Sequence, residues 1–123
     1  MLNLSPTLPL HLCCTPTDMR KNFDGLCGII SGSFRKDPLR DGLFVFVNKR
    51  RDRMKLLVWD RHGYWLMYKR LEAGRFQMPP SDTNGISPET LRITYEQLLL
   101  IIEGIDLQSV KRRKRYALPH SGL

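Results

Sequence analysis

The apolar positions of the middle of the chain alternate with polar ones, which predicts strands. Three such runs predict strands at residues 43–48, 53–59 and 64–71. The segments between them, "KRRD" and "DRHG", have the length of hairpin loops. Short loops cannot make the crossover that parallel strands need, so these three strands are expected to be antiparallel.

The register follows if each loop has four residues. One face of the sheet then carries mainly aliphatic side chains, namely Leu43, Val45, Val47, Met54, Leu56, Val58, Trp65 and Met67. The other face mixes aromatic with cationic side chains, namely Phe44, Phe46, Arg53, Lys55, Leu57, Trp59, Tyr64, Leu66, Tyr68 and Arg70. We expect the aliphatic face to form the core. Two further short strands are expected, at residues 11–15 and around residues 75–77.

Helical spacing appears first before this sheet and again after it. The earlier stripe consists of Met19, Phe23, Leu26, Cys27 and Ile30. It predicts a helix over residues 18–31 that is capped by Thr17, ends near Gly32 and covers the aliphatic face.

The second helix lies in "TYEQLLLIIEGID". Thr94 and Gln97 have the spacing of a capping box, and Gly104 stands where a C-terminal cap belongs. Together the elements predict an α+β fold, a three- to four-stranded antiparallel meander flanked by two helices.

The chain length of 123 residues suits one domain. We place that domain at residues 11–108, after a loose leader at 1–10 and before a flexible basic tail at 109–123. No run of 18 apolar residues occurs, and the start "MLNLSPTLPLHLCC" lacks the basic residues of a signal peptide. We therefore expect a cytoplasmic protein without membrane contact, and nucleoid association stays open.

The net charge of +8 is concentrated at one end of the chain. The segment "KRRKR" at residues 111–115 contributes +5, whereas the first 110 residues carry 15 basic and 12 acidic side chains. A cationic run of this kind binds polyanions readily. Cations on a rigid hairpin also suit phosphate, and neighbouring aromatic rings suit unpaired bases. The alternative for the hairpin is a solvated surface whose charges prevent edge-to-edge pairing.

Both surfaces can be assigned residue by residue. The candidate nucleic-acid-binding residues are Arg20, Lys21, Lys49, Arg50, Arg51, Arg53, Lys55, Arg61, Lys69, Arg70, Arg75, Lys111, Arg112, Arg113, Lys114 and Arg115. The candidate protein-interface residues are Trp59, Tyr64 and Tyr68.

The sequence offers no set of residues typical of an active site. The three histidines fall next to the leader, on a turn and in the tail, and the carboxylates show no two-metal spacing. Cys13, Cys14 and Cys27, with His11, lack the paired Cys-x-x-Cys spacing of structural zinc. We expect free thiols, no metal, no cofactor and no enzymatic activity.

Three stretches of the chain carry a resemblance to a known family. They are "TDMRKNFDGLCGII", "DPLRDGLFVFVNKRRDRMKLLVWDRHGYWLMYKRLEAGRF" and "ITYEQLLLIIEGIDLQSVKRRKRY". They closely resemble the small accessory protein, called TnpB or the second reading frame, of bacterial insertion sequences of the sixty-six family. That accessory protein is distinct from the RNA-guided nuclease that is also called TnpB. The resemblance implies a non-catalytic helper of DNA transposition, encoded beside a larger transposase, and supplies no catalytic residues.

The resemblance is compatible with two mechanisms. In the first, Arg20, Lys21, the hairpin cations and the tail bind DNA phosphates and help to assemble the transposase at the element ends. In the second, the protein is an adaptor that contacts the transposase through the aromatic face without touching DNA. Contact through cations predicts steep salt dependence, and contact through aromatic rings predicts little. A small nuclease or toxin is disfavoured because catalytic groups are missing. The sequence leaves the oligomeric state open.

Removing residues 111–123 is expected to leave the fold intact and to weaken DNA binding sharply, because the five cations of the tail are lost. Binding of a labelled duplex at low salt measures the effect, with circular dichroism as the control for folding. Equal affinity of the truncated and intact proteins would show that the tail is no electrostatic anchor.

Overall fold

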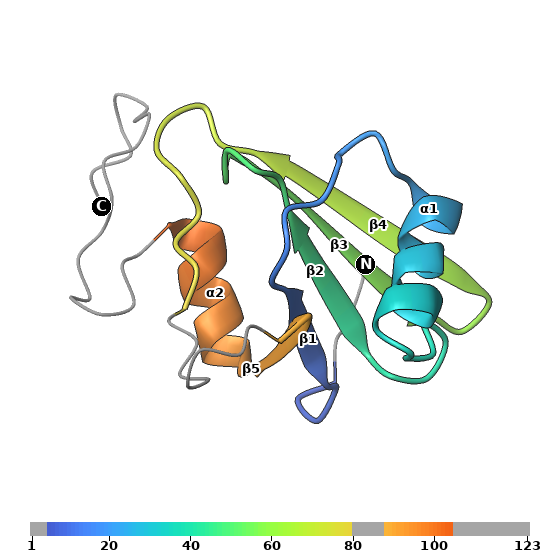
Figure 1. Ribbon diagram of the computed structural model, residues 1–123. Helices are drawn as coiled ribbons and strands as arrows, with labels where there is room; N and C mark the ends of the chain where they lie inside the picture. The colour runs from blue at the N-terminus through green and yellow to red at the C-terminus, as the bar shows by residue number, and fades with distance from the viewer. Residues whose placement is uncertain (1–4, 80–87, 105–123) are drawn as a thin grey trace.

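The alternating segments form the centre of one five-stranded sheet. The computed structural model describes residues 5–79 and 88–104. The sheet has the order β4-β3-β2-β1-β5 (Figure 1). The strands are β1 (Leu10–Cys13), β2 (Leu43–Val47), β3 (Arg53–Asp60), β4 (Gly63–Arg70) and β5 (Thr90–Ile93). The helices are α1 (Phe23–Gly28), which continues as the π-helical turn η1 (Ile29–Ser33), and α2 (Tyr95–Glu103).

The predicted register of the three central strands is confirmed. Leu43 lies opposite Val58 in the β2–β3 pair. Trp59 lies opposite Tyr64 in the β3–β4 pair. The two faces therefore contain the residues that the alternation assigned to them. All five residues of β2 are buried, so both faces of the sheet are covered.

The prediction of a three- to four-stranded antiparallel meander was wrong in two respects, because the sheet has five strands and one of its pairs is parallel. β1 pairs in parallel with β2, with Leu10 opposite Leu43, and antiparallel with β5, with Leu10 opposite Ile93. The connection between β1 and β2 carries α1, which gives it the length that a parallel crossover needs. β1 also begins one residue earlier than predicted. β5 has only four residues, too few to show an alternating pattern.

The strand expected at residues 75–77 does not form. Phe76 is instead completely buried in the core, and its backbone N–H donates to the carbonyl of Arg51 at 2.7 Å. The segment after β4 thus covers the sheet through one aromatic side chain, without a ladder of strand hydrogen bonds.

The first helix begins later than the apolar stripe predicts. Asn22 is its N-cap, whereas Thr17 is buried and its N–H donates to the carbonyl of Val47 at 2.9 Å. Between them the chain makes a turn, in which the N–H of Lys21 donates to the carbonyl of Asp18. The helical segment ends at Ser33, close to the predicted position.

The two helices cover opposite faces, but not in the predicted arrangement (Figure 1). Leu26 and Ile30 of the first helical segment pack against Phe44, Phe46 and Leu57, which belong to the face expected to be mixed. The aliphatic face is covered by α2, through Leu98 and Ile101. The prediction failed because the aromatic residues occupy the middle of the mixed face, while its exposed arginines, Arg53 and Arg70, stand at the strand ends.

The ends of α2 confirm their local signals. The Thr94 side chain accepts from the N–H of Gln97, and the Gln97 side chain accepts from the N–H of Thr94. Gly104 closes the helix in the left-handed conformation, with φ of 71°. Among the described helices, none has the length and apolar character needed to traverse a bilayer.

His11 is a buried polar residue in the middle of β1. Its Nε2–H donates to the carbonyl of Asp41 at 2.7 Å, and its ring stacks on Phe44. Burial, assisted by the positive charges of Lys36 and Arg92, lowers the pKa of His11, although the bond to Asp41 opposes this effect. The folded protein therefore favours the neutral imidazole.

Acidification is expected to destabilise the protein through His11. Below about pH 6.5 the unfolded chain takes up a proton that folded His11 does not, so the free energy of unfolding falls until the pH reaches the lowered pKa. Urea unfolding at about pH 7.5 and about pH 5.5 measures the decline, which His11→Gln should reduce. His62→Gln, in the exposed β3–β4 turn, is the control. An unchanged decline in the His11 variant would contradict this origin.

Candidate nucleic-acid interface

The β2–β3 loop is held in one conformation by two polar residues that sequence reasoning missed. The Asn48 side-chain oxygen accepts from the N–H groups of Asp52 and Arg53, each at 3.0 Å. Its amide nitrogen donates to the Asp52 carboxylate at 2.7 Å. Asn and Asp at the ends of a short loop are a recognisable signal for this geometry. An ordered loop therefore carries the exposed side chains of Lys49, Arg50 and Arg51.

A second ordered loop lies beside it, between β1 and α1. Thr17 fixes this loop to the end of β2, and Asp18 folds it by accepting from the N–H of Arg20 at 2.9 Å. The Arg20 guanidinium also donates to Asp18 at 2.7 Å, and this bond lowers the pKa of the carboxyl to about 2. The Arg20 side chain remains 92% exposed. Both loops thus present cations from fixed backbones.

A cleft of about 470 Å³ opens between these two loops. Its charged and aromatic lining, which we call the basic cleft, comprises Asp18, Arg20, Lys49, Arg50, Asp52, Arg53 and Tyr68. Four cations thus face two carboxylates. Both carboxylates are already engaged, Asp18 by Arg20 and Asp52 by Asn48. Because Arg20 is engaged in the same ion pair, Lys49, Arg50 and Arg53 are the cations with the most capacity for a ligand.

Lys55 is buried behind the residues of the basic cleft and does not belong to its surface. It is only 3% exposed. Its Nζ donates to the carbonyls of Met19 and Lys21 at 2.8 and 2.7 Å, and to the side-chain oxygen of Asn22 at 2.9 Å. These bonds engage all three donors of the ammonium group. We therefore leave Lys55 out of the phosphate-binding set.

Three other candidate cations lie outside the lining of the basic cleft. Lys21 follows Arg20 in the turn and is exposed. Arg51 lines a smaller adjacent hollow of about 250 Å³. Arg70 lies opposite Arg53 on β4 and forms an ion pair with Glu72 at 2.7 Å.

The remaining candidates also lie outside its lining. Arg61 occupies the β3–β4 turn, at the opposite end of two eight-residue strands. Lys69 lies on the face covered by α2 and donates to the carbonyl of Ile102 at 3.3 Å. Arg75 is exposed in the segment after β4. The tail cations, residues 111–115, lie outside the described residues.

The three predicted interface aromatics lie on one face of the sheet, but their environments differ. Trp59 and Tyr64 pack edge to face at 5.0 Å. Burial, together with hydrogen bonding to Cys27, raises the pKa of Tyr64 to about 12. Tyr68 is exposed and lines the basic cleft. Trp65, which the prediction left out, is 46% exposed on the opposite face.

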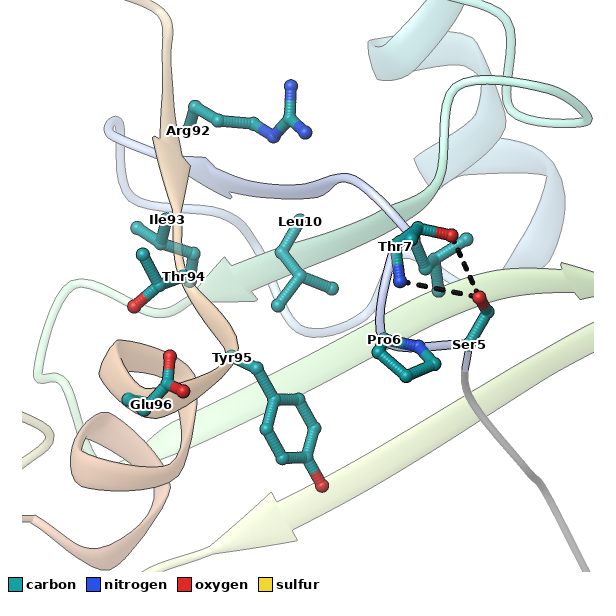
Figure 2. A pocket seen from close by; sticks show the side chains of 10 residues that line it. Ser5, Pro6, Thr7, Leu10, Arg92, Ile93, Thr94, Tyr95 and Glu96 are labelled. Carbon is teal, nitrogen blue, oxygen red and sulfur yellow. Dashed lines mark hydrogen bonds between the residues drawn. The ribbon is translucent and has the colours of Figure 1, made fainter.

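A larger hollow, of about 790 Å³, lies at the other side of the sheet (Figure 2). It is bordered by residues 5–8, by Leu10 and by residues 92–96 around the start of α2. Among the described residues, its charged lining consists of one cation, Arg92, and one carboxylate, Glu96. Ser5 and Thr7 bond to each other within their own loop. Without a surplus of positive charge, this hollow suits a polyanion less well than the basic cleft does.

The sulfur residues do not form a metal centre in the part of the chain that the structure describes. Cys13, Cys14 and Cys27 are free thiols. No three His, Cys, Asp or Glu side chains of this part gather as a metal ion would require.

Comparison with known proteins gives consistent matches along most of the chain. The family model described as "IS66 Orf2 like protein" matches residues 8–112. The chain is 32% identical over 113 residues to the uncharacterized protein y4jC of Sinorhizobium fredii, which covers 92% of each protein. It is 33% identical over 90 residues to the uncharacterized protein y4hO of the same organism, covering 73% of this chain and 74% of the relative. No solved structure matches.

Replacing Lys55 is expected to destabilise the fold, because three oxygen acceptors lose a charged donor. Hydrogen bonds to charged groups contribute about 1.5–3 kcal/mol, so Lys55→Met should lower the free energy of unfolding by about 2 kcal/mol. Urea denaturation measures this change. Lys49→Met, in the exposed loop, is the control and should alter stability by less than about 0.5 kcal/mol. Equal stability of the two variants would contradict a structural role for Lys55.

Proposed function

Since the chain belongs to the IS66 Orf2-like family of transposition accessory proteins, we propose that it assists a separate transposase by binding DNA through the basic cleft. The proposed role is non-catalytic, with strand breakage and joining left to the transposase. The observation that carries the DNA contact is the gathering of Arg20, Lys49, Arg50 and Arg53 around one hollow.

Phosphate binding is the chemistry that this arrangement fits best. Each DNA phosphate that a cation neutralises releases condensed counterions, and this release drives binding. The loops that border the basic cleft are fixed by Asn48 and by Thr17. Less conformational entropy is therefore lost when the protein binds DNA. Phosphate contacts alone position a protein without reading sequence. The basic cleft is therefore proposed as a clamp for the DNA backbone.

A second candidate function is an adaptor that contacts the transposase without touching DNA. It is favoured by Trp65, which is 46% exposed on the side of the sheet away from the basic cleft. Aromatic rings of this kind are enriched in protein interfaces. Binding through Trp65 would depend little on salt, whereas binding through the basic cleft would depend on it steeply.

The double variant Lys49→Ala, Arg50→Ala is expected to weaken duplex binding and to reduce its salt dependence. Each phosphate contact contributes about 0.9 to the slope of log affinity against log salt concentration, so the slope should become shallower by about 2. The measurement is a salt series with a labelled element-end duplex and a scrambled duplex. Equal wild-type affinity for both duplexes is expected of a backbone clamp, whereas preference for the element end would add reading of sequence or shape.

Arg40→Ala with Arg61→Ala is the matched control, because it removes the same charge from exposed positions at the other end of the sheet. The clamp requires that this control keep nearly the wild-type slope. Equal effects of the two double variants would show that DNA binding depends on general surface charge and not on the basic cleft. Absence of wild-type binding at low salt would exclude DNA as the partner and leave the adaptor function.

A further inference from the structure

Tyr68 is the single aromatic residue in the described lining of the basic cleft, and it is exposed. The residue is 52% exposed, although it lies on the same face of the sheet as the buried Phe46 and Leu57. The Tyr68 hydroxyl can donate to a phosphate oxygen, but the flat face of its ring is a further surface that a phosphate does not use. The ring therefore calls for a ligand that has a flat surface as well as negative charge.

The orientation of this ring is held by contacts on one side. The Lys55 Nζ lies 4.9 Å from the ring centroid, in the geometry of a cation–π contact. Lys55 is in turn fixed by its three oxygen acceptors. Arg53 reaches the Tyr68 hydroxyl at 3.5 Å. The ring is thus supported from within the protein, while about half of the residue's surface stays accessible.

A base in duplex DNA cannot use such a ring. Its two flat faces are covered by the neighbouring bases, and a protein side chain reaches them only when the base leaves the stack. An unpaired strand, in contrast, presents its bases to any aromatic platform. Proteins that bind single strands combine such platforms with a cationic groove that follows the backbone.

We propose that the basic cleft accepts an unpaired nucleotide of DNA, with its base stacked on Tyr68 and its flanking phosphates held by Lys49, Arg50 and Arg53. This inference rests on the proposed DNA-binding function and adds an unpaired nucleotide to the DNA backbone as a ligand of the basic cleft. The surplus of cations around the ring favours a nucleotide over an apolar peptide, for which these charges would have to be desolvated without a partner.

Substitution of Tyr68 should separate single-strand binding from duplex binding. The probes are a labelled oligothymidine of about ten nucleotides and a duplex of the same length, both measured by fluorescence anisotropy at constant salt. Tyr68→Leu is expected to weaken binding of the single strand about tenfold or more and to change duplex binding by less than about twofold. Tyr68→Phe should keep the single-strand affinity, since stacking needs the ring and not the hydroxyl.

Tyr95→Leu is the matched control, because Tyr95 is 50% exposed but lies at the start of α2, beside the large hollow (Figure 2). It should leave both affinities unchanged. A loss by Tyr68→Leu that is equal for both probes, or equal to that of Tyr95→Leu, would overturn the stacking inference while leaving DNA binding in place. If the wild-type protein bound neither probe at low salt, the proposed function would fail together with this inference.

A photochemical crosslink tests the same contact in the unaltered protein, without any question of folding. An oligothymidine containing 5-iododeoxyuridine is irradiated in the complex, and the crosslinked peptide is identified by mass spectrometry. Stacking predicts a crosslink at Tyr68. A crosslink confined to another part of the chain would place the base elsewhere and overturn the proposal.

Discussion

The buried ammonium group of Lys55 is the interaction on which the basic cleft depends. It lies on an interior strand of the sheet, and its three bonds fasten the turn of residues 19–22 across that strand. Burial of a charge costs several kcal/mol unless its donors find acceptors, and here all three do. The same group holds Tyr68 from below. One side chain thus fixes both the turn of residues 19–22 and the Tyr68 ring.

This contact also explains why the first helix starts late. The carbonyls of Met19 and Lys21 would point along the axis of a helix if residues 18–31 were helical throughout, and they would then serve its internal bonds. Lys55 binds them instead, and the helix begins at Phe23. The apolar stripe is therefore real at Leu26 and Ile30, which are completely buried, and interrupted before them by a side chain distant in sequence.

The predictable parts of the fold are those governed by neighbours in sequence. Alternation and short loops were sufficient to predict the register of β2 with β3 and of β3 with β4. The Thr94–Gln97 spacing was sufficient to predict the start of α2. The β1–β2 and β1–β5 pairs depend on residues far apart in the chain, and no local pattern specifies them. The same distinction applies to the site. Residue type identified Arg20, Lys49, Arg50 and Arg53 as candidate cations, but it grouped them with Arg61, Lys69 and Lys55, which the fold directs elsewhere.

The competition between apolar and charged character in residues 48–76 is resolved by position along the strands. The middle of each face is buried under a helix, so exposed charge can remain only at the ends, where the loops emerge. The resulting cleft is a modest electrostatic attractor, since two carboxylates oppose its four cations. Its particular contribution is geometry, an ordered set of donors around a ring. The five cations of residues 111–115 add charge without requiring such geometry. In the proposed function both the tail and the cleft contribute salt-dependent affinity, and the ring of the cleft would distinguish unpaired from paired bases.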